Sequence, residues 1–380
     1  MAERAEHLGV STSLLGAVAL ARTGLWKELT EIDVAGPRAQ QASMAALAVA
    51  ISVTVACTMH LPEPWWAAIS GFISTQATRP ASVTKGVLRI IGTVVGAAAA
   101  LLLVGWLAYD QVACCVALFI VCTIGILALN VSPHGYAWLF FSVTFSLVLL
   151  MSLVDPLNAF DFAAYRTFEV VIGTIAAIIV ATTLAPEGSV GGAAAPPGWT
   201  DLLGARRPAV LHAVRGGIAV AVIPVLWSYF YLPGLSATAT TVASVLAVPV
   251  LAEHPLDSDR KMVERAIHRL LGCFVGGIAA LALLAIPLTE FLPWLVSLAA
   301  GTWLFAFIQS SSRGIGYLGT QAAVVFVLTL VQGDGAPTSI MPALDRFAGI
   351  TIGMTTLFVV CLLLEPATDA EATQSAACPR

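Results

Sequence analysis

The stretch RIIGTVVGAAAALLL, residues 89–103, returns 180 residues later as RLLGCFVGGIAALAL, residues 269–283. Eight of the fifteen positions are identical, and each copy begins with an arginine followed by a Gly-xxx-Gly pair. The same offset pairs Arg166 with Arg346 and Gly173 with Gly353. An offset that persists over several segments indicates an internal duplication.

Composition places the duplicated segments in a membrane. Hydrophobic residues make up 58% of the 380 residues and charged residues 11%, with a mean hydropathy of +0.90. Soluble domains carry about a quarter charged residues, and a membrane span needs about 20 apolar ones. Apolar runs bounded by proline, glycine or charge predict twelve spans, of which the second and eighth are short and polar: 43–61, 65–79, 86–108, 112–130, 135–153, 163–185, 208–230, 234–251, 267–287, 290–309, 314–332 and 346–365.

We therefore predict an all-α membrane protein of about 12 transmembrane helices, arranged as two parallel six-helix repeats around a pseudo-two-fold axis along the membrane normal. The expected domains are a cytoplasmic N-terminal segment (1–42), a first repeat (43–185), a cytoplasmic linker (186–207), a second repeat (208–366) and a cytoplasmic tail (367–380). With the N-terminus inside, sixteen of the eighteen lysines and arginines fall on the cytoplasmic side, as the positive-inside rule requires. The exceptions are Arg166 and Arg346.

The N-terminal segment contains an apolar run from Leu8 to Ala21 that resembles the core of a signal peptide. Glu3 and Glu6 stand where a signal peptide carries basic residues. We therefore expect an interfacial or cytoplasmic helix before the first span, and cleavage as the alternative.

Several classes of function are disfavoured. The net charge is −4 without a basic stripe, so no nucleic-acid partner is expected. The seven cysteines lie mostly in apolar runs without a CxxC pair, which favours small buried side chains over a metal site or disulfides. No phosphate-binding loop, HExxH or GxSxG occurs, and the loop after the second span lacks the Gly-xxx-Asp-Arg pattern of major-facilitator transporters. We expect neither an enzyme nor a cofactor.

Four arginines are the leading candidates for a binding site. Arg89 and Arg269 begin equivalent predicted spans from the cytoplasmic side, where they either anchor the helix to headgroups or attract carboxylates to an inner vestibule. Arg166 and Arg346 begin spans from the outer side, next to acids. They either form local salt bridges there or line an outer anion site.

Other polar side chains fall inside predicted spans. Glu169 lies one turn from Arg166 on the same helix face, so it is either an ion-pair partner or a proton-coupling carboxyl. Its equivalent in the second half is Gly349, which makes it asymmetric. Gln76 and Gln321 either bond between helices or line a polar substrate path.

The motif PWWAA at residues 64–68, the segment that follows to Gln76, then Lys85 and the Arg89-x-x-Gly-Thr-x-x-Gly helix, resemble the fusaric acid resistance family of bacterial inner-membrane proteins. The second half keeps Pro233 without the tryptophans, and Cys273 replaces the threonine. The chain also departs from long family members in lacking a large cytoplasmic domain.

The resemblance implies export of aromatic carboxylic acids from the bacterial inner membrane, often with a periplasmic adaptor and an outer-membrane channel. The family is also similar to plant aluminium-activated malate channels, whose six-span subunits pair around a basic anion pore. We therefore predict a proton-driven exporter of small organic anions in a lipid bilayer, with both termini cytoplasmic. The alternatives are a passive anion channel on the same scaffold and a membrane assembly factor that transports nothing.

Overall fold

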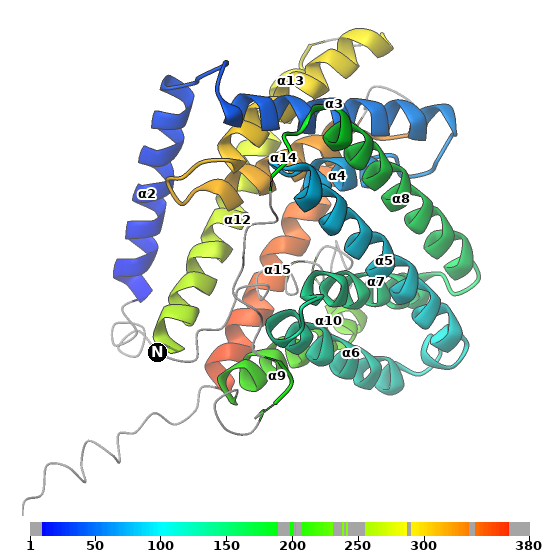
Figure 1. Ribbon diagram of the computed structural model, residues 1–380. Helices are drawn as coiled ribbons and strands as arrows, with labels where there is room; N and C mark the ends of the chain where they lie inside the picture. The colour runs from blue at the N-terminus through cyan, green and yellow to red at the C-terminus, as the bar shows by residue number, and fades with distance from the viewer. Residues whose placement is uncertain are drawn as a thin grey trace, which may run out of the picture.

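The computed structural model describes residues 10–188, 198–200, 202, 207–230, 238, 241, 255–286, 290–333 and 339–364. Within these residues the chain is helical, and nine helical segments are long and apolar enough to cross a bilayer. The helices, shown in Figure 1, are α2 (Val10–Thr30), α3 (Pro37–Thr58), α4 (Trp65–Ser74), α5 (Arg79–Leu107), α6 (Gln111–Val131), α7 (Gly135–Val154), α8 (Ala159–Leu184), α9 (Arg207–Ala221), α10 (Ile223–Phe230), α12 (Pro255–Leu284), α13 (Phe291–Gln309), α14 (Gly316–Leu330) and α15 (Met341–Leu363).

The nine long segments coincide with nine of the twelve predicted spans, and the other three require comment. The second span, predicted over 65–79, was wrong as a crossing, because α4 has 10 residues and is about 15 Å long against a hydrocarbon core of about 30 Å. The eleventh span is the apolar but shorter helix α14, of 15 residues. The eighth span lies outside the described residues except at Thr238 and Thr241, as do most of the predicted linker and the whole predicted tail.

Helix α4 is short because the chain turns at Thr75 and restarts at a proline in the first turn of α5. The Ser82 hydroxyl accepts a hydrogen bond from the backbone amide of Gln76 at 2.8 Å, which secures this turn. Glycines let α4 approach its neighbours closely. A methyl group placed at Gly173 of α8 would lie 2.0 Å from the Ala67 carbonyl oxygen. The polar residues of this segment are thereby held inside the protein.

Two helix pairs in the two halves of the sequence make matching contacts through the glycines of the repeated stretch. In α5, methyl groups at Gly92 and Gly96 would lie 2.3 and 2.5 Å from the carbonyl oxygens of Ala137 and Phe141 in α7. In α12, Gly272 and Gly276 face Leu318 and Ala322 of α14 in the same way, at 2.5 and 2.1 Å. In lipid, where apolar burial drives no association, such close backbone contact is what joins helices.

We expect Gly276→Ala to lower the free energy of unfolding by about 1–3 kcal/mol, because the new methyl group overlaps the Ala322 carbonyl and forces α12 away from α14. The control is the next residue. A methyl group at Gly277 meets only Val325, at 3.8 Å, and alanine is the better helix former. Thermal unfolding in detergent should show Gly276→Ala destabilised and Gly277→Ala unchanged or more stable. Equal midpoints for the two variants would contradict the close packing.

The two halves of the chain also contact each other in two equivalent ways. Helix α3 packs against α13, and α6 packs against α9. One apolar core extends over α3, α4, α13 and α14, and a second over α5, α6, α7, α9 and α15. Polar side chains are therefore buried between helices that belong to different parts of the sequence.

Helix α2 lies alongside α12 (Figure 1) and contributes Ala21 to the first apolar core. Among the described residues, α2 is not one of the segments that are long and apolar enough to cross a membrane. Its buried Glu28 accepts hydrogen bonds from Arg38 Nη2 at 2.5 Å, Arg313 Nη1 at 2.8 Å and the Ser311 hydroxyl at 2.6 Å. Because Arg38 lies on α3 and Arg313 precedes α14, this ionic clamp joins three segments.

Candidate functional site

Arg89 stands at the centre of a first polar cluster between α4, α5 and α7. Its side chain is 1% exposed. Its Nη1 donates to the Tyr136 hydroxyl at 3.3 Å and its Nη2 to the Ser70 hydroxyl at 3.2 Å, while the guanidinium lies 4.1 Å from the Phe140 ring centre. Lys85, one turn earlier on α5, lies 5.5 Å from the Tyr136 ring. These five residues form what we call the first cluster.

Arg269 makes the same contacts in the second half of the chain and is also 1% exposed. Its Nη1 donates to the Tyr317 hydroxyl at 3.1 Å and its Nη2 to the Thr241 hydroxyl at 3.2 Å. Arg265, one turn earlier on α12, lies 4.1 Å from the Tyr317 ring. Arg265, Arg269, Tyr317 and Thr241 form the second cluster, so each cluster contains two cations, a phenol and an aliphatic hydroxyl.

The depth of these arginines differs from the sequence expectation. Helix α5 begins at Arg79 and α12 at Pro255, which places Arg89 and Arg269 about 15 and 21 Å along their helices. The sequence predicted both arginines at the cytoplasmic ends of their helices. The helices start earlier because prolines and polar residues extend them outward beyond the apolar run. Both arginines therefore lie inside the helix bundle.

Arg166 and Arg346 approach the same region rather than a separate outer site. Arg166 lies within electrostatic range of Arg89 and of Arg346, and Arg346 lies within range of Arg269. The Arg166 guanidinium lies 2.9 Å from the centre of the Trp66 ring. The sequence had suggested an inner pair and an outer pair, but all four arginines belong to one connected group, because α8 and α15 bring their arginines inward past their first turns.

The four arginines carry surplus positive charge. All are buried, and none takes part in an ion pair among the described residues, so the expected local salt bridges of Arg166 and Arg346 are not formed there. In the same part of the chain, donors at Arg89 Nε, Arg166 Nε and Nη1, Arg269 Nε and Arg346 Nε have no acceptor. A buried charge without a partner is costly, so the arrangement suits a bound anion with several oxygen acceptors.

Two carboxyl groups, those of Glu169 and Glu63, lie within electrostatic range of Arg166. Glu169 is fully buried, and its Oε1 accepts a hydrogen bond from the Glu63 backbone amide at 2.8 Å. Its Oε2 has no partner among the described residues. Glu63 in turn accepts a hydrogen bond from the Trp66 indole at 2.8 Å. Burial raises the pKa of Glu63 above its ordinary value, against the opposing effects of the Trp66 hydrogen bond and the Arg166 charge.

The two predicted glutamines have different surroundings. Gln76 lies in the turn after α4, where its amide nitrogen donates to the carbonyl oxygens of Ile73 and Thr75 at 3.1 and 2.7 Å. Gln321 lies on α14, one turn after Tyr317, and is 5% exposed with no donor for its Oε1 among the described residues. Gln321 therefore belongs with the second cluster, whereas Gln76 secures a turn.

Sequence analysis assigned no site role to several of these residues: Tyr136, Phe140, Ser70, Tyr317, Thr241, Arg265, Glu63 and Trp66. The tyrosines had a signal, since the dipeptides Gly135-Tyr136 and Gly316-Tyr317 are equivalent in the two halves, at an offset of 181. Trp66 resembled an interfacial tryptophan and Glu63 an outer-loop acid. Only their contacts with Glu169 and Arg166 identify them.

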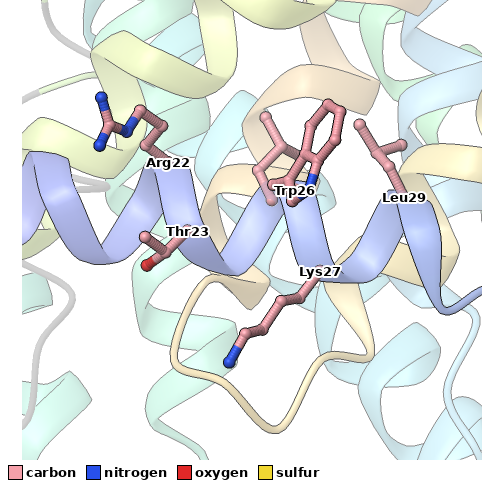
Figure 2. A pocket seen from close by; sticks show the side chains of 6 residues that line it. Arg22, Thr23, Trp26, Lys27 and Leu29 are labelled. Atoms are coloured by element: carbon pink, nitrogen blue, oxygen red, sulfur yellow. The ribbon is translucent and has the colours of Figure 1, made fainter.

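A surface cavity of about 490 Å³ lies elsewhere, on α2. Figure 2 shows Arg22, Thr23, Trp26, Lys27 and Leu29 around it. The four buried arginines do not line this cavity. It is therefore separate from the two clusters.

Two family models match the chain, one in each half. Residues 39–196 match the model of the fusaric acid resistance protein family, and residues 258–360 match a model described as fusaric acid resistance protein-like. No curated protein and no solved structure matches the chain. The two matched regions together make up well over half of the chain and contain all four buried arginines, and the chain belongs to the fusaric acid resistance family of membrane proteins.

Proposed function

We propose that this protein is a bacterial inner-membrane transporter that exports small organic anions, aromatic carboxylates among them, using the proton gradient. The observation that carries the proposal is the group of four buried arginines without acidic partners in ion-pair contact among the described residues. A carboxylate offers two oxygens to the planar guanidinium fork. Its binding would compensate the charge that the protein itself leaves unbalanced.

The proposed path runs between two parallel six-helix repeats, with both termini in the cytoplasm. Three sets of equivalent contacts support this arrangement: the glycine contacts of α5 with α7 and of α12 with α14, the two arginine clusters, and the reciprocal packing of α3 on α13 and of α6 on α9. Because Arg89 and Arg269 would lie near one axis, a bound anion would have two similar binding positions. In this scheme the anion moves from Arg89 or Arg269 towards Arg166 and Arg346.

Proton coupling would arise at Glu169, beside Arg166. The arginine lies within electrostatic range of both Glu169 and Glu63. The Glu169 carboxyl would be the proton carrier, which takes up a proton from the acidic outer side and releases it to the cytoplasm while the anion moves outward. One proton would then enter for each anion that leaves. The second half has no counterpart of Glu169, so one coupling site serves the whole chain.

Transport into inverted membrane vesicles tests this function. The vesicles should accumulate benzoate or a related aromatic acid when their interior is acidified, and less when the pH gradient is collapsed. Flux that is equal with and without the gradient would favour the passive channel. Absence of flux for every acid of an aromatic and aliphatic panel, with the protein folded in the membrane, would support the assembly factor.

We expect Glu169→Gln to uncouple transport from protons, because the amide keeps the size and the hydrogen bond from the Glu63 amide but cannot take up a proton. Accumulation driven by a pH gradient should fall about tenfold, which corresponds to roughly 1.4 kcal/mol of lost coupling. Downhill anion flux should persist. The matched control is Glu290→Gln, an exposed acid before α13. Full proton-driven accumulation by Glu169→Gln would remove Glu169 from the mechanism.

A further inference from the structure

Helix α2 has one buried face, which fixes its orientation. Gly24 and Glu28 lie one turn apart on this face, and both are buried. A methyl group placed at Gly24 would lie 3.0 Å from the Ile315 side chain, and Glu28 makes the ionic clamp with Arg38 and Arg313. These contacts determine which side chains of α2 point away from the helices behind it.

The opposite face of α2 carries both apolar and basic side chains. Arg22, Trp26 and Leu29 are exposed at a spacing of four and three residues, which places them on one side of the helix, and Lys27 is exposed beside them. These four residues, which we call the α2 face, line the surface cavity of about 490 Å³. In Figure 2 the side chains of Arg22 and Lys27 extend to opposite sides of the helix. The α2 face therefore presents an apolar strip with a cation on either side.

Trp26 is the apolar centre of the α2 face. It is 70% exposed, so most of its surface is uncovered. An indole left in water forgoes the gain from burial, whereas the boundary between headgroups and acyl chains is where the tryptophans of membrane proteins gather. The exposure of Trp26 therefore favours contact with lipid at the membrane surface.

The charge of the α2 face indicates the kind of lipid. Arg22 and Lys27 take part in no ion pair among the described residues. The acids that follow them in the sequence, Glu28 and Glu31, both pair with Arg313. Two cations without an acidic partner in that part of the chain complement a negatively charged membrane surface, because long basic side chains reach the phosphates while their stems stay in the apolar boundary.

We infer that the α2 face binds anionic phospholipid at the membrane surface. Trp26 and Leu29 enter the boundary between headgroups and acyl chains, Arg22 and Lys27 bind headgroup phosphates on the two sides of the helix, and the cavity gives room for the glycerol phosphate. With both termini in the cytoplasm, the lipid belongs to the inner leaflet, where anionic lipids attract basic segments. Because Glu28 joins α2 to α3 and to the segment before α14, a bound lipid also stabilises the contacts among these three segments.

The first experiment measures thermal unfolding of the full chain in a neutral detergent, with increasing amounts of phosphatidylglycerol or of the zwitterionic phosphatidylcholine. We expect phosphatidylglycerol to raise the unfolding temperature more, because a ligand that binds the folded state stabilises it. In the double variant Arg22→Gln with Lys27→Gln, the phosphatidylglycerol concentration that gives half of this rise should increase about 10- to 30-fold. The matched control is Arg207→Gln with Lys261→Gln, which removes two exposed cations from α9 and α12.

The second experiment tests whether Trp26 contacts the lipid. The wild-type chain and Trp26→Phe are reconstituted into vesicles of phosphatidylglycerol and phosphatidylcholine whose acyl chains carry bromine near the headgroup, which quenches nearby tryptophan fluorescence. The difference between the two emission spectra isolates Trp26 from the other tryptophans. We expect the emission of Trp26 to be quenched in brominated vesicles relative to unbrominated ones. This measurement decides the matter even if the double variant folds poorly.

Each outcome bears on the inference without any measurement of transport. A stabilising effect of phosphatidylglycerol that is weakened in the Arg22 and Lys27 double variant and kept in the control supports it, as does quenching of Trp26. Equal stabilisation by the two lipids, or an equal loss in the two double variants, overturns it. The same rise in unfolding temperature with inorganic phosphate alone would assign the two cations to a soluble anion and also overturns it. Emission of Trp26 that bromine leaves unchanged rules out the membrane contact.

Discussion

Arg269→Ala lowers the apparent affinity for transported anions about 10- to 100-fold in the result we expect, because it removes a charged hydrogen-bond donor worth about 1.5–3 kcal/mol. Protein levels should fall less than affinity does. The substitution leaves the Tyr317 and Thr241 hydroxyls without their donor, but it also relieves a buried charge that has no ion-pair partner in the described part of the chain. Concentration dependence of uptake in inverted vesicles gives the affinity, and immunoblotting gives the level.

Three further variants make this prediction specific. Arg89→Ala should have a similar effect, because Arg89 holds the equivalent place in the first cluster. Arg269→Lys should be intermediate, since lysine keeps the charge but not the planar fork. Arg207→Ala is the control, since Arg207 is an exposed arginine at the start of α9. Unchanged uptake by both Arg89→Ala and Arg269→Ala would show that the anion does not pass the clusters.

Loss of the ionic clamp at Glu28 should have the largest effect on stability. We expect Glu28→Ala to lower the free energy of unfolding by about 2–3 kcal/mol, because three donors, two of them charged, then lose a buried acceptor. Exposure of Arg38 and Arg313 at their outer sides keeps the loss below that of a fully buried ion pair. The control is Glu31→Ala, an exposed acid that also pairs with Arg313. Thermal unfolding in detergent should distinguish the two variants.

The clamp also has a pH dependence of known sign. Although burial opposes ionisation, the Ser311 and Arg38 hydrogen bonds and the charges of Arg38 and Arg313 hold the pKa of Glu28 below its ordinary value of 4.5. The clamp therefore stabilises the fold above the pKa of the unfolded chain and loses this effect as the pH falls through the lower, folded value. The gap in unfolding temperature between the wild-type protein and Glu28→Gln should be full at neutral pH and narrow below about pH 4. A gap that widens in acid would contradict the clamp.

Hydropathy was enough to predict the long helices, but it did not predict how deeply their polar side chains lie in the helix bundle. Hydropathy finds an apolar run reliably, so the nine long segments coincide with predicted spans. It does not find where a helix extends beyond that run, as α5 does from Arg79. Arg89 consequently had a surface position in the sequence interpretation and a buried one in the fold. The predicted second span ran on through the polar residues 75–79, whereas helix α4 ends at Ser74.

Sequence reasoning identified the four arginines of the candidate site but not the residues that contact them. Arginine and glutamate in an apolar run are conspicuous, because their burial is costly. Tyr136, Ser70 and Trp66 are ordinary residues for a membrane protein, and only packing brings them to Arg89 and Arg166. When a cation and its partner lie on different helices, no fixed spacing in the sequence reveals that they are in contact.

The amino-acid sequence alone determined that the chain is helical, membrane-embedded, duplicated and rich in intramembrane arginine, because hydropathy and repetition are properties of the order of residues. The tertiary structure decided that the four arginines form one connected group and that Glu169 is held by the Glu63 backbone rather than paired with Arg166. Those relations depend on how helices from distant parts of the chain approach one another. That approach is set by small residues and close packing, which no single segment encodes.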